Sequence, residues 1–81
     1  MNMFEDYHDD EWVELKVYFS DGMQRRWLSS AMNFDYVADK CILIHKDRDR
    51  ICVPLSSVNY CATSIAAMPS CENPFQVFEY E

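Results

Sequence analysis

The sequence predicts an all-β domain, or a β-rich α+β domain, in which a small antiparallel sheet of five to six strands forms a barrel or sandwich with at most one short helix. Apolar and polar residues alternate over residues 12–19, which is the period of a half-buried strand. Residues 41–44 are apolar on both faces, as in a central strand. With 49% hydrophobic residues in a chain of 81, we expect one folded core rather than disorder.

Residues 12–28 predict an antiparallel hairpin, for which two loops are possible. A two-residue Asp-Gly turn would pair Phe19 with Gln24 and mix apolar and polar faces. A three-residue Ser-Asp-Gly loop pairs Phe19 with Met23 instead and requires a left-handed conformation at Gly22. We predict the three-residue loop because it keeps the faces separate.

The next segments predict two further hairpins. Residues 29–39 form either a short helix or a loop that leads into a strand at residues 34–37, and their aromatic and β-branched residues favour the strand. A turn at residues 38–40 then leads into a strand at residues 41–45. The charged residues 46–50 form the tip of the following hairpin, and Pro54 ends its second strand.

Three parts of the chain are expected. Residues 1–11 form an acidic N-terminal segment, residues 12–63 form the antiparallel β core, and residues 64–81 form a C-terminal extension that packs on the core. The end of this extension, residues 74–80, is either an edge strand or a tail laid over the sheet.

Several short segments of the β core share their layout with a known class of proteins. They are Val17-Tyr18-Phe19-Ser20-Asp21-Gly22, Tyr36-Val37, Ile42-Leu43-Ile44 and Val53-Pro54-Leu55-Ser56-Ser57-Val58. The shared layout extends over about residues 13–62 and resembles that of many small β proteins of bacteriophages and mobile elements. Phage-encoded inhibitors of host defence, including anti-CRISPR proteins, are similar in size, acidity and lack of catalytic motifs. The resemblance implies a protein that acts by binding, and it assigns a role to no individual residue.

The charge distribution favours a basic partner. The net charge is −7, from 14 acidic and 7 basic residues, and residues 1–14 contain acidic residues but no Lys or Arg. Such a surface repels nucleic acid and anionic membranes at long range and attracts basic proteins. The alternative that the charge only keeps a small protein soluble stays open.

No sequence motif points to catalysis, a metal or a cofactor. The chain lacks GxSxG, Walker, HExxH and Rossmann signatures, so we expect no enzyme and no cofactor. A thiol–imidazole pair is also not expected, because Cys41 and His45 would lie about 13 Å apart on one strand face. Cys41, Cys52, Cys61 and Cys71 lack the paired spacing of zinc knuckles.

The cysteines also indicate a compartment. No N-terminal apolar stretch of signal-peptide type is present, so we expect a cytoplasmic protein (the host cytoplasm for a phage protein) with reduced thiols buried as small hydrophobic residues.

A basic and aromatic group, Arg25 to Trp27 with Lys16 and Tyr18 opposite, has the composition of single-strand nucleic-acid binders. The negative net charge favours ordinary cross-strand pairing of these residues instead.

The leading functional hypothesis is a non-enzymatic inhibitor that occludes a basic surface of a host nucleic-acid or defence protein. Its partner-binding residues would lie in the acidic segment and at the start of the first strand: Glu5, Asp6, Tyr7, Asp9, Asp10, Glu11, Trp12 and Glu14. The aromatic rings, including Phe4, would be the anchors among the carboxylates. In the alternative, this segment is a leader folded over the domain's own core. Other hypotheses are a self-assembling subunit that pairs through exposed β edges, and a small thiol or metal protein.

Overall fold

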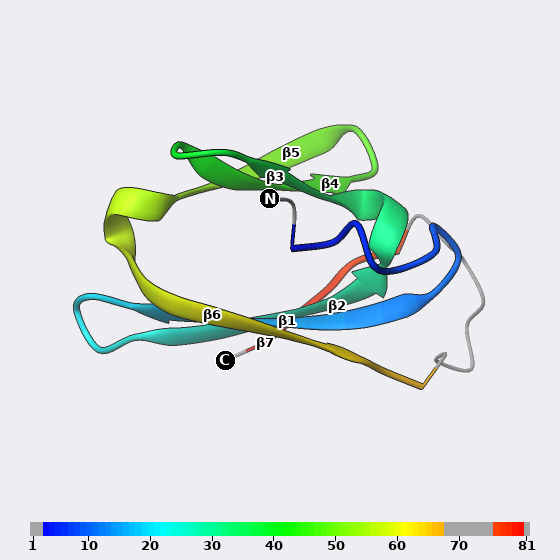
Figure 1. The fold of residues 1–81 in the computed structure, drawn as a ribbon, viewed down its shortest axis with the longest axis horizontal. Helices are drawn as coiled ribbons and strands as arrows, with labels where there is room; N and C mark the ends of the chain where they lie inside the picture. Colours follow the sequence, from blue (N-terminus) through cyan, green and yellow to red (C-terminus); the bar gives the residue numbers. More distant parts are fainter. Residues whose placement is uncertain (1–2, 68–75, 81) are drawn as a thin grey trace.

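A computed structural model describes residues 3–67 and 76–80, which form seven strands in two antiparallel sheets (Figure 1). The four-stranded sheet has the order β6-β1-β2-β7, and the three-stranded sheet has the order β3-β4-β5. The strands are β1 (Trp12–Phe19), β2 (Gln24–Ser30), β3 (Phe34–Val37), β4 (Cys41–Lys46), β5 (Asp49–Pro54), β6 (Val58–Ile65) and β7 (Phe78–Tyr80). Two short 3₁₀ turns, η1 (Ala31–Asn33) and η2 (Leu55–Ser57), complete the described elements. The prediction of an antiparallel all-β domain is therefore confirmed.

The β1–β2 hairpin has the predicted register. Leu15 lies opposite Trp27, and the Phe19 N–H donates to the Met23 carbonyl at 2.8 Å. Gly22 has a φ of +92°, which is the left-handed conformation that the three-residue loop requires. The apolar residues of β1 therefore share one face, as the alternation predicted.

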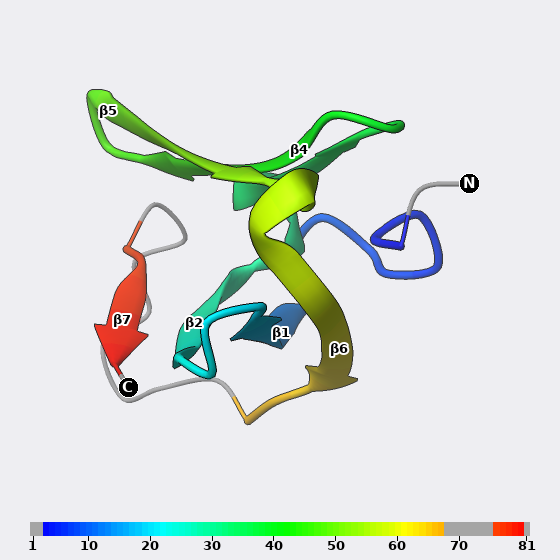
Figure 2. The same ribbon diagram turned by 90° about the vertical axis from the view of Figure 1, so that its left-hand side faces the viewer.

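The expected sheet of five to six strands, forming a barrel or sandwich, is confirmed only in its antiparallel all-β character. The described residues form two separate sheets that are not closed into a barrel. The two sheets separate at Pro54, which lacks the N–H needed to continue a ladder, and the chain then passes through η2 into the other sheet. Figure 2 shows this crossing, in which β6 runs from the upper sheet down to the lower one.

The structure decides between the alternatives left open for residues 29–39 and, among the described residues, for the C-terminal end. Residues 34–37 form the predicted strand, preceded by the 3₁₀ turn η1 rather than by an α-helix. At the C-terminal end, residues 78–80 form an edge strand that pairs with β2. Residues 64 and 65 of the proposed extension belong to β6, and residues 68–75 and 81 lie outside the described residues.

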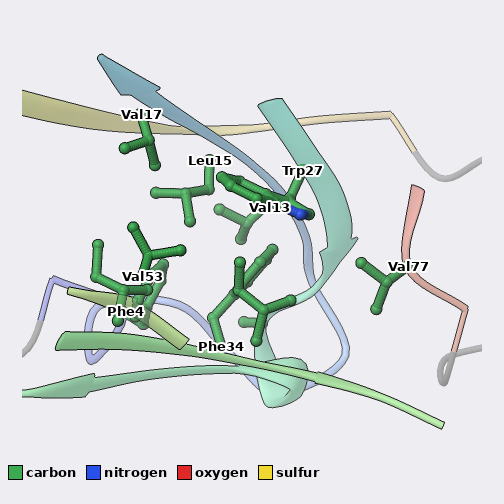
Figure 3. Packing of buried hydrophobic residues seen from close by; sticks show 11 residues of the cluster. Phe4, Val13, Leu15, Val17, Trp27, Phe34, Val53 and Val77 are labelled. Carbon is green, nitrogen blue, oxygen red and sulfur yellow. The ribbon is translucent and has the colours of Figure 1, made fainter. Parts of the chain in front are cut away.

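The hydrophobic core lies between the two sheets (Figure 3). The four-stranded sheet contributes Val13, Leu15, Val17 and Trp27 to this core, and the other side of the core contains Phe34 and Val53 of the three-stranded sheet. Phe4 and Val77 also belong to this buried cluster, so the N-terminal segment and the C-terminal extension both contribute to the core. In a domain this small, such additions matter because the core is limited by the surface-to-volume ratio.

Candidate functional site

The acidic N-terminal segment is held in place by the rest of the fold. The Phe4 ring stacks on Phe34, with the ring centroids 5.2 Å apart. The Ala31 N–H donates to the Glu11 carbonyl at 2.7 Å, and the Tyr7 hydroxyl donates to Thr63 Oγ1 at 3.1 Å. Figure 2 shows the segment in blue, beside β6 and below the three-stranded sheet. The segment is therefore a folded part of the domain.

Most carboxylates of this segment face solvent. Glu5, Asp6, Asp9 and Asp10 are exposed. Glu11 has a local structural role, because its Oε1 accepts the backbone N–H of His8 at 2.8 Å. The segment thus presents four exposed carboxylates, which we call the acidic head.

Two of the three aromatic anchors expected in this region, Phe4 and Trp12, are buried and not available to a partner. Trp12 is only 4% exposed and Phe4 only 5%. The Trp12 ring packs against Phe78 of β7, with centroids 6.3 Å apart, and Tyr7 is half-buried against β6. The aromatic residues therefore act as the second hypothesis expected, in which the segment is a leader that covers the domain's own core. The carboxylates of the segment stay accessible.

Glu14 lies apart from the acidic head. Its side chain is on the outer face of the four-stranded sheet, where Oε2 accepts the Tyr80 hydroxyl at 2.8 Å and Oε1 lies 3.6 Å from Lys16 Nζ. Burial, together with this carboxylate, raises the pKa of the Tyr80 hydroxyl. We therefore assign Glu14 to the sheet and not to a partner-binding surface.

A shallow hollow beside the acidic head contains an exposed apolar residue that the sequence analysis did not identify. It has a volume of about 270 Å³ and is lined by Asp10, Glu11, Trp12, Ile65 and Ala66. Ile65 is 67% exposed, more than any other large hydrophobic residue that the structure describes. The hollow places this exposed side chain near Asp10 of the acidic head and near Glu11.

Met32 adds a second apolar group at the same end of the molecule. Its backbone N–H donates to the Asp9 carbonyl at 3.2 Å, and its side chain is 41% exposed. No sequence pattern identifies Met32 or Ile65 as exposed, because exposure depends on which elements pack over them.

The basic and aromatic group does not form one surface. Alternation along β2 sends Trp27 into the core, and Arg25 pairs with Glu79 at 3.1 Å. On the opposite face, the Arg26 guanidinium lies over the Tyr80 ring at 4.3 Å. Both cations therefore form cross-strand contacts within the domain. This is the ordinary cross-strand pairing that the sequence analysis favoured over nucleic-acid binding.

A larger groove of about 390 Å³ opens between the end of the β1–β2 hairpin and β5. Phe19, Met23, Arg25, Trp27, Ile51 and Val53 are among its lining residues. The buried Trp27 Nε1 has no hydrogen-bond partner among the described residues, but Figure 3 shows this nitrogen on the side of the ring nearer Val77. Its charged lining residues are Asp21 and Arg25, and Arg25 is already paired with Glu79.

The thiols differ from the expectation of buried core cysteines. Cys52 is exposed and Cys41 is half-exposed, both on the outer face of the three-stranded sheet. The hydrogen bond between their side chains raises the pKa of the Cys41 thiol. Cys61 is half-buried, 3.9 Å from the Met3 sulfur, and burial raises its pKa. Cys71 lies outside the described residues.

The remaining chemical groups of the described residues form no recognisable centre. His45 Nε2 lies 2.8 Å from Asp35 Oδ2 on an exposed face. Within residues 3–67 and 76–80, no three His, Cys, Asp or Glu side chains are grouped so that they could hold a metal ion. The described part of the chain also has no helix of sufficient length and apolar character to cross a membrane.

Comparison with known proteins adds no assignment to this geometry. No protein family matches the sequence, and neither the curated proteins nor the solved structures include a significant match. The function must therefore be inferred from the chain's own surface.

Proposed function

We propose that this protein is a non-enzymatic binding module that docks the acidic head on a basic partner. The observation that supports it best is the position of the exposed Ile65 beside Asp10 and Glu11 in one hollow. Apolar surface bordered by charge is the usual composition of a protein-binding site, since burial of the apolar group supplies affinity and the charges supply steering.

The fixed backbone of the acidic head strengthens this proposal. Its hydrogen bonds from Ala31 and Met32 order the segment before binding, so little conformational entropy is lost on association. A segment that served only for solubility would need no such attachment. Ile65 and Met32 replace Trp12 and Phe4 as the apolar contacts in this proposal.

The partner class follows from the charge. Four exposed carboxylates are complementary in charge to a basic surface that normally binds nucleic acid. The partner that we propose is a host defence protein of the CRISPR type. This chain would then be its inhibitor, encoded by a phage or mobile element. Binding there would block nucleic acid by occupying its site, and would require no catalysis.

The test compares two variants with the same net charge. The head variant carries Asp6→Asn, Asp9→Asn and Asp10→Asn, and the control variant carries Asp39→Asn, Asp47→Asn and Asp49→Asn. All six carboxylates are exposed, and asparagine suits the positive φ of Asp39 and Asp47. The probe is a synthetic peptide in which arginine and leucine alternate, and its association rate is measured at low and high salt.

We expect the head variant to associate about tenfold more slowly at low salt, with a smaller difference at high salt, and the control variant to stay close to the wild type. Ile65→Thr, which retains a β-branched side chain, should speed dissociation without slowing association. Equal slowing of both charge variants would contradict the proposal, because it would show that only the total charge acts.

The same proteins, immobilised and exposed to the heparin-binding fraction of a bacterial lysate, test the class of partner. We expect the wild type and the control variant to retain a nucleic-acid-binding protein, and the head variant not to retain it. Free DNA should displace this protein from the wild type and from the control variant. Retention by all three proteins would contradict docking through the acidic head.

A further inference from the structure

The outer face of the three-stranded sheet carries two thiols side by side. Cys41 lies opposite Pro54 and Cys52 lies opposite Leu43, so the two cysteines are diagonal neighbours on adjacent antiparallel strands. The residue that follows each cysteine in its strand is buried in the core, and alternation therefore turns both thiols outward. A hydrogen bond joins the two side chains. The β4–β5 hairpin thus forms a thiol pair whose spacing in the sequence is not that of a CxxC motif.

Both thiols of this pair are accessible. Cys52 is exposed and Cys41 is half-exposed. Figure 2 shows the three-stranded sheet at the top of the molecule, where no described element lies above β4 and β5. The adjoining positions of this face hold Val37, Leu43 and Pro54, whose side chains have no metal-binding atoms. A ligand from solvent can therefore reach both sulfurs.

The strand spacing disfavours a direct disulfide between the two cysteines. Diagonal neighbours in an antiparallel pair have Cα atoms about 7–8 Å apart. A disulfide usually requires Cα atoms less than about 7 Å apart, so closing one here would require the strands to move. An ion held between the sulfurs requires less movement, because two metal–sulfur bonds of about 2.3 Å each, the length known for zinc, span a wider gap. The pair is therefore better placed to bind an ion than to form a cross-link.

The number of donors selects the kind of ion. Structural zinc has four protein ligands, mostly from Cys and His. Within the described residues no three side chains of the types His, Cys, Asp and Glu are grouped for a metal, and His45 of β4 already contacts Asp35 at 2.8 Å. Copper(I) has a different requirement, because this soft ion prefers thiolates and is satisfied by two of them in a nearly linear arrangement. Two thiols without a third donor therefore suit copper(I).

The charges of the protein also favour one cation per chain. A net charge of −7 attracts cations at long range and opposes the bridging of two copies by a shared ion. The hydrogen bond with Cys52 raises the pKa of the Cys41 thiol, and the positive charge of Lys40 acts in the opposite direction. When both thiols have lost their protons, Lys40 offsets part of the resulting negative charge.

We propose that Cys41 and Cys52 bind one copper(I) ion between their sulfurs on the outer face of the three-stranded sheet. Each thiol gives its proton to solvent and forms one sulfur–copper bond, so binding releases two protons and oxidises neither sulfur nor copper. The site shares no residue with the acidic head. It is therefore a second binding activity, independent of the function proposed above.

Copper(I) alone, added as its acetonitrile complex to the reduced protein without oxygen, is the probe. A chromophoric copper(I) chelator competes for the ion and reports the affinity, and native mass spectrometry counts the ions bound. Cys52→Ser is the test variant. Cys61→Ser is the matched control, because Cys61 is another described thiol and its sulfur lies 3.9 Å from the Met3 sulfur. Cys71→Ser is a second control, since this cysteine lies outside the described residues.

We expect the wild type and both controls to bind one ion with the same affinity. Cys52→Ser should bind it about 100-fold more weakly or worse, since even the loss of a group that only orients a metal ligand costs up to this factor. Unchanged binding in Cys52→Ser overturns the proposal. Loss of binding in Cys61→Ser or Cys71→Ser, or a dimer held together by the ion, overturns it as well.

The pH dependence distinguishes a site of two thiols from a single sulfur. Below the thiol pKa, the release of two protons lowers the dissociation constant about 100-fold for each unit rise in pH, whereas the release of one proton lowers it about tenfold. We expect the steeper dependence in the wild type and the shallower one in Cys52→Ser. Zinc(II) in equal amount should not displace the copper(I). A tenfold dependence in the wild type, or displacement by zinc(II), overturns the proposal.

Discussion

Phe4 stacks on Phe34 across the boundary between the acidic segment and the three-stranded sheet, with the ring planes 16° apart. Phe4→Ala should therefore destabilise the whole domain by about 3 kcal/mol, because it removes a buried aromatic ring from the shared core. Urea unfolding measures this change. Asp6→Ala, at an exposed position two residues away, is the control and should be near neutral. A small effect of Phe4→Ala would mean that the segment is dispensable for the fold.

Substitution of Gly22 in the loop of the first hairpin should change the stability only through the backbone conformation. Gly22 has a φ of +92°, and a Cβ added there would meet no atom within 4 Å. Gly22→Ala should cost roughly 1 kcal/mol of stability, since an L-residue is strained at this φ. Gly22→Asn should cost less, because asparagine tolerates the left-handed region better. Thermal unfolding compares the two variants, and equal costs would argue against backbone strain as the cause.

The thiols should differ in reactivity. The exposed Cys52 should react with a neutral alkylating reagent faster than Cys61, whose pKa is raised by burial. Peptide mapping by mass spectrometry assigns the label to each residue. Faster labelling of Cys61 than of Cys52 in the folded protein would contradict the arrangement of β5 and β6.

The Cys41 thiol gives a prediction with a definite sign. Its hydrogen bond with Cys52 raises its pKa, so less thiolate is present at neutral pH and labelling should increase as the pH rises above the ordinary thiol range. Cys52→Ala removes this partner and should lower the pKa of Cys41, which makes labelling at neutral pH faster. An unchanged pH profile in Cys52→Ala would exclude the thiol pair.

Tyr80 links the C-terminal edge strand to β1 through its hydrogen bond to Glu14. Its pKa is raised by burial and by this carboxylate, so the folded state binds the phenolic proton more tightly than the unfolded state does. The resulting stability is present below the ordinary tyrosine pKa and is lost as the pH rises through the raised value.

Glu14→Gln tests this linkage by removing the negative charge but retaining an acceptor. The ultraviolet titration should then show one tyrosine ionising at lower pH than in the wild type. Tyr80→Phe is the control that assigns this step, and its titration should lack the step altogether. A Glu14→Gln titration identical to that of the wild type would contradict the contact.

The local structure was largely predictable, because hairpin register depends on residues that are neighbours in the sequence. The alternation over residues 12–19 and the position of Gly22 were enough to pair Leu15 with Trp27. The strand at residues 34–37 was predictable for the same reason. The charged tip predicted at residues 46–50 is shorter than expected, because Lys46 belongs to β4 and Asp49 and Arg50 belong to β5. The candidate site was predictable only in its carboxylates, since exposed acidic residues need no partner elsewhere in the chain.

Tertiary structure decided which surfaces are covered. Trp12 lies on the polar face of its strand by alternation, yet Phe78, 66 residues further along the chain, helps to bury it. Ile65 has the hydrophobicity of a core residue, yet it stays exposed beside the acidic head. The sequence by itself determined which side chains share a strand face, because the backbone period is two residues. Whether that face meets the core, another strand or solvent depends on contacts between distant segments, and only the folded chain brings those segments together.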